Sequence, residues 1–416
     1  MKTYVMIIKF CLLFCLIGGM AACEKDQDTD ASFQPKKIEL TARGAEVIGN
    51  SNDFGVRLFS QLAADTHENI MISPLSASAA LTMLLNGAEG ETYTQIREMI
   101  GYPAALDIKG INEAYKSLVG QLLHVDPKVT LTLANAIFYR QDFDVKPPFI
   151  QAMDREFDAH IRPLNFANPS AVEVINQWAS DQTRGRIPKV LEEIDPEMVM
   201  FLMNALYFKG DWTYQFDASQ TFDGNFYLDN GEVITAPTMR GNKKTRRYAG
   251  SGFDVVELPY GQSNFSMVVV LPQSGLNEVH AGFSPALWKE ITDGLDSESQ
   301  FTETIVQMPR FTFDFDAMLN DPLKSLGMVN AFNEKLADLS GISDWDIFVS
   351  FVKQNTFVEV NEEGTEAAAV TTVGVGVTSV GPDQGPPFFI IDRPFVFAIR
   401  ERTTNTLLFI GQLTNL

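Results

Sequence analysis

The pattern of apolar and polar positions divides the chain into a helix-rich first third and a strand-rich remainder. Residues 51–64 carry four large apolar side chains at helical spacing, which predicts an amphipathic helix. A second helix is predicted to begin at Ser73, whose hydroxyl can cap it, with Pro74 at its first position and a stop near Gly87. The first part of the folded chain is therefore expected to be helical.

Strands are predicted where β-branched and aromatic residues gather in short runs. These runs are residues 130–139, 267–271, 306–315, 394–400 and 406–413. The last two are separated by the turn-forming residues 403–405, so they are expected to pair. Helices followed by strands, without regular alternation, predict an α+β fold.

The first 22 residues predict a signal peptide, because Lys2 and Lys9 accompany an apolar run at residues 10–20 that is too short to remain in a bilayer. The string that ends at Cys23 resembles a bacterial lipobox, which implies that Cys23 becomes a lipidated N-terminus; the alternative is an ordinary signal peptide. The polar residues 23–43 are interpreted as a flexible tether. Acidic residues after Cys23 resemble the export signals of Bacteroidetes-type lipoproteins, which implies a bacterial outer-membrane protein exposed at the cell surface.

Charge and composition exclude several classes of function. The formal net charge of -21 argues against nucleic acid or heparin as a partner, since both are polyanions. The basic run at residues 243–247 is more simply read as a solvated turn than as a binding site. The four histidines show no metal-binding spacing and no serine lies in a hydrolase elbow, so we expect no metal, no cofactor and no catalytic residues. The sequence is compatible with a pair of catalytic carboxylates, because Asp and Glu are plentiful.

The most unusual segment is residues 362–387. It begins acidic, continues with small and β-branched residues, ends in glycines and prolines, and carries no Lys, Arg or aromatic residue between Gly364 and Pro387. Read at strand period, one face is small or β-branched throughout and the other tolerates solvent. The pattern alone leaves three readings: an exposed linker, a permanent strand, or a loop that can become a strand.

This segment resembles the hinge and reactive loop of inhibitory serpins. The implied hinge comprises Glu362, Glu363, Gly364, Thr365, Glu366, Ala367, Ala368 and Ala369. Other segments resemble motifs of the same family in the expected order: residues 69–76, 176–178, 185–187, 204–212, 357–360, 392–397 and 409–411. The resemblance implies one serpin domain at residues 44–416, with three β-sheets, eight to nine helices and an exposed reactive-centre loop, acting as a monomer without a cofactor.

The resemblance also implies a mechanism. A serine protease attacks the loop and forms a covalent acyl-enzyme, and the cut loop then inserts into the main sheet and traps the protease. The family spacing from Gly364 places the cleaved bond at Thr378-Ser379. A small residue there favours elastase-like or subtilisin-like targets over trypsin, which requires Lys or Arg. The alternatives are a non-inhibitory serpin that acts as a carrier or chaperone, an inhibitor of cysteine proteases, and an unrelated surface enzyme or glycan-binding lipoprotein.

Five further positions match the region where the family's main sheet opens: Trp212, Ser73, Ser76, Asn204 and Gln354. Trp212 matches the tryptophan at the point where insertion starts, and the others match a polar cluster beneath the sheet. The family's usual histidine aligns with Gln354. Glutamine can donate and accept hydrogen bonds but does not titrate, so histidine-dependent pH sensitivity is not expected at this position.

Overall fold

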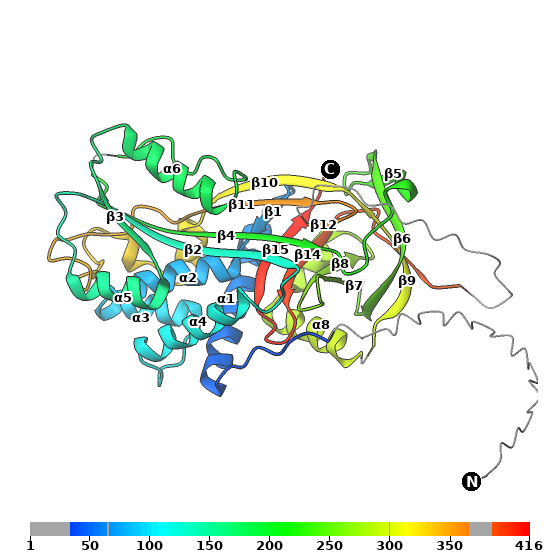
Figure 1. Ribbon diagram of the computed structural model, residues 1–416, viewed down its shortest axis with the longest axis horizontal. Helices are drawn as coiled ribbons and strands as arrows, with labels where there is room; N and C mark the ends of the chain where they lie inside the picture. The colour runs from blue at the N-terminus through cyan, green and yellow to red at the C-terminus, as the bar shows by residue number, and fades with distance from the viewer. Residues whose placement is uncertain (1–33, 65, 196, 299, 366–384) are drawn as a thin grey trace, which may run out of the picture. The chain divides into compact units, whose positions relative to one another are not determined.

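The computed structural model describes residues 34–64, 66–195, 197–298, 300–365 and 385–416. The fold is α+β, as predicted, with the helices concentrated in the first part of the chain and the strands in the remainder (Figure 1). The helices of the described residues are α1 (Ala42–Ala63), α2 (Pro74–Leu85), α3 (Gly90–Ile100), α4 (Ile108–Leu122), α5 (Pro147–Phe157), α6 (Ser170–Gln182), α7 (Leu276–Gly282), α8 (Pro285–Ser297) and α9 (Asn320–Ser325).

The strands form two continuous sheets. One has six strands, in the order β10 (Phe311–Met318), β11 (Lys353–Val360), β12 (Gly364–Thr365), β4 (Met200–Asp211), β2 (Val129–Arg140) and β3 (His160–Leu164). The other has nine: β1 (Ile70–Ile72), β15 (Leu407–Leu413), β14 (Phe395–Glu401), β8 (Phe265–Pro272), β7 (Phe253–Tyr260), β6 (Val233–Ala249), β9 (Thr302–Pro309) and β13 (Phe388–Ile390), with β5 (Phe222–Tyr227) paired to β6.

The resemblance led us to expect three sheets. Two of the three are joined into the nine-stranded sheet by one long strand, β6. The first part of the 17-residue β6 pairs with β5 and β9, and its last four residues pair with β7. Both parts therefore belong to one hydrogen-bonded sheet, although they face different neighbours.

Helices cover both faces of the six-stranded sheet (Figure 1). Helix α6 lies on one face, where Ile175 packs in an apolar cluster with Phe138 of β2 and Phe201 of β4. Helices α1 and α2 lie on the other face, and the main apolar core fills the space between them and the nine-stranded sheet.

The chain already contacts the folded body before residue 44: Ile38 is buried, and the Lys36 N–H donates to Asn264 Oδ1 at 2.9 Å. One predicted strand boundary needs correction. The run at residues 306–315 is two strands, β9 and β10, which belong to different sheets. Pro309 ends β9, where its ring removes a backbone donor, and the chain passes at Arg310 into the six-stranded sheet.

The capping and turn predictions are confirmed. The Ser73 hydroxyl accepts a hydrogen bond from the Ser76 N–H at 3.2 Å at the start of α2. In the turn between β14 and β15, Asn405 adopts a left-handed conformation (φ 59°), which asparagine tolerates better than most residues.

The basic run at residues 243–247 is part of β6 and is not the solvated turn expected from the sequence. Lys243 is 6% exposed, and its ammonium group lies 4.2 Å from the centre of the Phe216 ring. Burial lowers the pKa of Lys243 to about 8, although Asp217 opposes the shift. Further along the strand, Arg246 pairs with Asp296, and Arg247 lies over Phe389. These three cations therefore contact aromatic or carboxylate groups of the fold itself.

Candidate functional site

The site centres on β12, which lies near the start of the unusual segment and ends at residue 365, the last described residue before 385. Gly364 lies opposite Asp211 of β4, and Thr365 lies opposite both Gly210 of β4 and Val360 of β11, antiparallel on both sides. Among the described residues, β11 and β4 are joined only through β12. A Cβ atom on Gly364 would lie 2.1 Å from the Gly210 carbonyl oxygen, so only glycine fits there.

An ion pair anchors the chain just before β12. Glu362, whose side chain is 8% exposed, accepts hydrogen bonds from Nε (2.8 Å) and Nη2 (2.5 Å) of Arg310. The Thr221 hydroxyl donates to the same carboxylate. Burial raises the pKa of Glu362, but the hydrogen bonds from Arg310 and Thr221 outweigh it and hold this pKa below its usual value. The hinge carboxylate is therefore charged and held at neutral pH.

Trp212 lies beside Asn361 and Glu363, the residues that precede β12. Its backbone N–H donates to the Glu363 carbonyl at 2.7 Å, and its indole N–H donates to the Asn361 carbonyl at 2.9 Å. Its ring stacks on Tyr260, with 4.4 Å between the ring centres. The Tyr260 hydroxyl in turn shares a 2.5 Å hydrogen bond with the Thr365 hydroxyl, and burial raises the pKa of Tyr260. The hinge is thus held by backbone, indole and phenol groups together.

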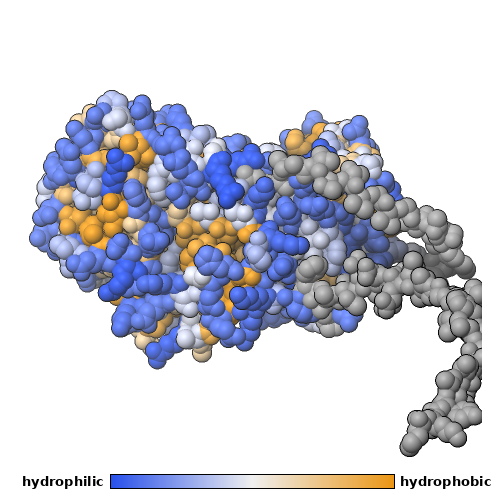
Figure 2. Space-filling model, viewed as in Figure 1, coloured by the Kyte–Doolittle hydropathy of each residue, from blue (hydrophilic) through white to orange (hydrophobic). Residues whose placement is uncertain are grey.

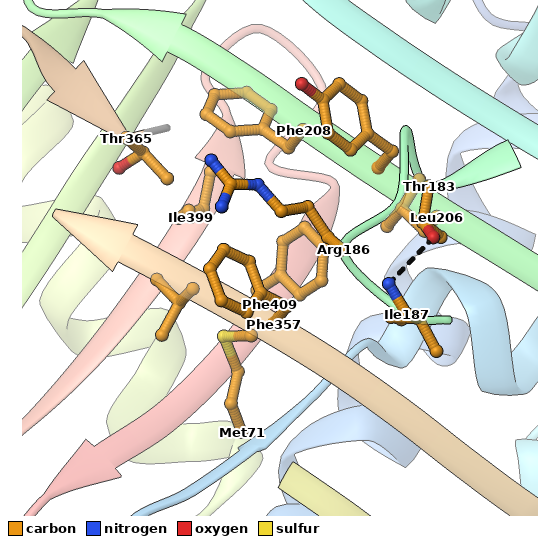
Figure 3. A pocket seen from close by; sticks show the side chains of 12 residues that line it. Met71, Thr183, Arg186, Ile187, Leu206, Phe208, Phe357, Thr365, Ile399 and Phe409 are labelled. Carbon is orange, nitrogen blue, oxygen red and sulfur yellow. Dashed lines mark hydrogen bonds between the residues drawn. The ribbon is translucent and has the colours of Figure 1, made fainter. Parts of the chain in front are cut away.

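A small cavity, about 20 Å³ in volume, continues the line of β12 between β11 and β4 (Figure 3). Its two sides are formed by residues of β4 and β11, and its floor by apolar residues of the strands beneath. The lining residues are Leu206, Tyr207 and Phe208 of β4; Phe357 and Val358 of β11; Met71, Ile399 and Phe409 beneath; Thr365 at one end; and Thr183, Arg186 and Ile187 from the turn after α6.

The structure brings together three of the four residues expected in the polar cluster. The Gln354 side chain accepts a hydrogen bond from the Ser73 N–H at 2.9 Å and donates to the Ser73 carbonyl at 3.0 Å. The hydroxyl of Ser73 accepts from the Ser76 N–H. Asn204 instead donates to Asn135 on the neighbouring strand β2 at 2.7 Å. Gln354 therefore joins the start of α2 to β11 through an uncharged pair of hydrogen bonds.

Several residues predicted to be functional lie outside the described residues. They are Cys23, Glu366, Ala367, Ala368, Ala369, Thr378 and Ser379. Their proposed roles stay predictions.

Sequence reasoning missed Arg310, Thr221 and Tyr260. Arg310 precedes Glu362 by 52 positions, and Tyr260 precedes Thr365 by 105. Each is an ordinary strand or loop residue in its own segment, and only the tertiary fold brings it to the hinge. A single sequence carries no signal for such a pair.

The described part of the chain shows neither a cluster of metal ligands nor a membrane-spanning helix. No group of three or more His, Cys, Asp or Glu side chains there could hold a metal ion. None of the helices found there combines the length and apolar character needed to cross a membrane.

The comparisons with known proteins agree on one family. The family described as "Serpin (serine protease inhibitor)" matches residues 49–416. Iripin-1 of Ixodes ricinus is 34% identical over 376 residues, which cover 88% of this chain and 94% of Iripin-1. Leukocyte elastase inhibitor of Xenopus laevis is 33% identical, with coverage of 83% and 93%.

The fold is similar to that of solved serpin structures. The native state of the thermophilic serpin tengpin superimposes with a TM-score of 0.81 at 30% identity, covering 92% of this chain and 96% of tengpin. The latent state of tengpin superimposes with a TM-score of 0.76.

Proposed function

Because the chain belongs to the serpin family, whose members are protease inhibitors and not enzymes, we propose that it traps serine proteases with a loop cleaved near Thr378-Ser379. After cleavage the loop inserts as a strand between β11 and β4. The observation that supports this proposal most directly is β12, which already occupies the first two positions of that strand, with Thr365 at one end of the small cavity between β11 and β4.

Continuing the register of β12 matches the composition of the loop. In the inserted strand, Ala367 would come between Val358 and Phe208, on the inner face where Thr365 contacts Tyr260. Val373, Val375 and Val377 would follow on the same face, and burying each of them would contribute about 1.5–3 kcal/mol. Each new backbone hydrogen bond adds a net of about 0.5–1.5 kcal/mol. The loop is therefore more stable inside the sheet than outside it.

The trapping step is tested at the hinge. Ala367→Arg forces a charged side chain into the inner face, so we expect the variant to be cleaved as a substrate and to form little covalent complex on a denaturing gel. Gln384→Arg is the matched control, because it adds the same charge to the loop on the far side of the cleaved bond. Ala367→Arg that traps protease with the stoichiometry of Gln384→Arg contradicts insertion.

The target class follows from the residues near the cleaved bond. No Lys or Arg is available between Gly364 and Pro387, so a trypsin-like protease finds no partner for its specificity pocket. Thr378 and the nearby valines suit elastase-like and subtilisin-like proteases, and one relative carries the name leukocyte elastase inhibitor. We expect fast trapping of elastase or subtilisin, none of trypsin, and a cut between Val375 and Val380 by mass spectrometry of the released peptide. A cut outside that range contradicts the assignment.

Cleavage should also raise the unfolding temperature strongly, because insertion completes the six-stranded sheet. An unchanged unfolding temperature after cleavage favours the alternative of a non-inhibitory carrier or chaperone. A covalent complex with a papain-type protease, formed faster than with elastase, favours the cysteine-protease alternative.

The proposal includes anchoring of the mature chain through lipid on Cys23 at the surface of a bacterial outer membrane. It rests on the resemblance of the leader to a lipobox. Metabolic labelling with a fatty acid tests it: wild-type protein should be labelled and Cys23→Ser should not. Equal labelling of the two excludes an anchor at Cys23, and protease treatment of intact cells reports the exposed side.

A further inference from the structure

The turn that follows α6 crosses the cavity in which the loop is proposed to insert. The buried Thr183 fixes this turn: its hydroxyl donates to the Ala179 carbonyl at 2.8 Å and accepts from the Ile187 N–H at 3.0 Å. Arg184 and Gly185 both adopt left-handed conformations, with φ values of 51° and 82°. This tight turn holds two arginines that are separated by a single residue.

The two arginines hold opposite sides of the cavity. The Arg184 guanidinium lies 5.1 Å from the ring centre of Tyr207 on β4. The Arg186 guanidinium lies 4.8 Å from the ring centre of Phe357 on β11, and its Nη2 is 3.1 Å from Glu359 Oε2. Figure 3 shows the Arg186 side chain extending across the opening between the two strands. Helix α6 itself is fixed to β2 and β4 by its apolar cluster, whereas the segment after it reaches β11 through Arg186 and, further along, through the Val190 carbonyl, which accepts from Lys353 Nζ at 3.3 Å.

The register of β12 indicates which loop residue would pass beneath the two arginines during insertion. Thr365 lies opposite Val360 and Gly210. If the inserted strand keeps this register, position 368 would come between Phe357 and Tyr207, the two rings that the arginines cover. Successive strand residues alternate between faces, so Ala368 belongs to the outer face, beneath the turn. A small residue is required there even though an outer face would otherwise tolerate a large one.

We propose that Arg184 and Arg186 form a clasp over the insertion cavity, and that Arg186 is the positioning residue whose release from Phe357 and Glu359 admits the strand. This inference rests on the proposed function, because it concerns the step that follows cleavage. The clasp also holds the uncut loop out of the sheet. It therefore governs both the lifetime of the active form and the size of residue accepted at position 368.

The first test follows spontaneous insertion without a protease. Purified variants are incubated at elevated temperature, and the fraction that becomes resistant to urea is measured over time on native gels. Arg186→Ala should convert about fivefold faster than wild type, since it loses a cation–π contact and an ion pair. Arg186→Lys keeps the charge and should stay within about twofold, and Glu359→Gln, which loses the ion pair alone, should lie between them.

Arg162→Ala is the matched control, because Arg162 is an exposed arginine on β3, at the far edge of the same sheet. Arg186→Ala that converts at the rate of Arg162→Ala overturns the clasp. If Arg186→Ala does not fold, Glu359→Gln still decides, because a rate equal to that of Arg162→Ala for this variant also overturns the clasp.

The second test separates a clasp from a merely stabilising contact. Ala368→Leu should turn much of the inhibitor into substrate, and adding Arg186→Ala should restore complex formation, because the larger side chain can then pass. A stabilising contact alone predicts no such rescue, so absence of rescue overturns the proposal. Failure of the wild-type chain to trap any protease is a different result, which defeats the proposed function and leaves the urea-resistance measurement to judge the clasp.

Discussion

The pair formed by Glu362 and Arg310 makes a quantitative prediction. Glu362→Gln keeps the shape of the side chain and removes its charge. The carboxylate is 8% exposed and accepts two hydrogen bonds from the guanidinium and one from Thr221, whereas the guanidinium side chain is 44% exposed. Hydrogen bonds to charged groups contribute about 1.5–3 kcal/mol. In the variant, the half-exposed Arg310 guanidinium can form hydrogen bonds with water instead, which limits the loss. We therefore expect a loss of about 2 kcal/mol in the free energy of unfolding.

Urea-induced unfolding followed by tryptophan fluorescence measures this loss, with Glu334→Gln as control, since Glu334 is exposed on the surface. Arg310→Gln should be worse, at about 3 kcal/mol or more, because it leaves a buried carboxylate unpaired. The double variant should lose less than the sum of the two single variants. Equal midpoints for Glu362→Gln and Glu334→Gln refute the anchoring role of the pair.

The pH dependence of the difference has a definite sign. The pKa of Glu362 is lower in the folded chain than in the unfolded chain, where it is about 4.3. The ionised carboxylate therefore stabilises the fold fully above that value, and its contribution is lost as the pH falls through the folded pKa. The gap between wild type and Glu362→Gln should be constant near neutral pH and should close in acid. A gap that widens below pH 4 contradicts this account.

Three other substitutions have expected outcomes. Gln354→His places a titratable group at a position only 7% exposed, where burial lowers the pKa of the histidine. The urea midpoint of the variant should therefore fall as the pH drops below about 6.5, while the wild-type midpoint changes less. Parallel pH curves for the two proteins contradict this. Thr365→Val leaves the buried Tyr260 hydroxyl without its partner and should lower stability by about 1–3 kcal/mol, a loss that adding Tyr260→Phe should largely recover, as thermal unfolding would show. Glu257→Gln removes the fully buried carboxylate that lies 2.7 Å from Arg400 and should lower the free energy of unfolding by about 3–5 kcal/mol, seen first as poor soluble yield; near-normal yield and midpoint contradict the role of this pair.

Much of the fold follows from short-range patterns. The cap at Ser73 and the strand at residues 130–139 are local features, so the sequence was sufficient to predict them. The split of residues 306–315 at Arg310 was missed, because β-branched and aromatic residues continue on both sides and only the three-dimensional fold sends β9 and β10 to different sheets. The place of Trp212 came from the family resemblance, since its stacking on Tyr260 joins residues 48 positions apart.

The residues that hold the hinge could not be predicted from the sequence, and the reason is physical. Arg310 and Tyr260 act on residues far along the chain, and neither has a local pattern that differs from an ordinary strand or loop position. Arg186 lies in a segment that the resemblance already included, but its importance depends on which strand its side chain reaches. Function here depends on pairings across the sheet, which a one-dimensional pattern does not contain.

The strands at the two ends of the reactive-centre loop, β12 and β13, belong to different sheets, and this has a topological consequence. Before the loop, β12 is held between two strands of the six-stranded sheet; after it, within the described part of the chain, β13 pairs only with β9 at the edge of the nine-stranded sheet, over three residue pairs. Under the proposed function, the intact chain links the two sheets covalently, so full insertion into the six-stranded sheet would require β13 to separate from β9. Hydrolysis of one peptide bond removes that linkage without breaking any strand pairing. The storage lifetime of the inhibitor is then expected to depend on β13, a strand that takes no part in capture.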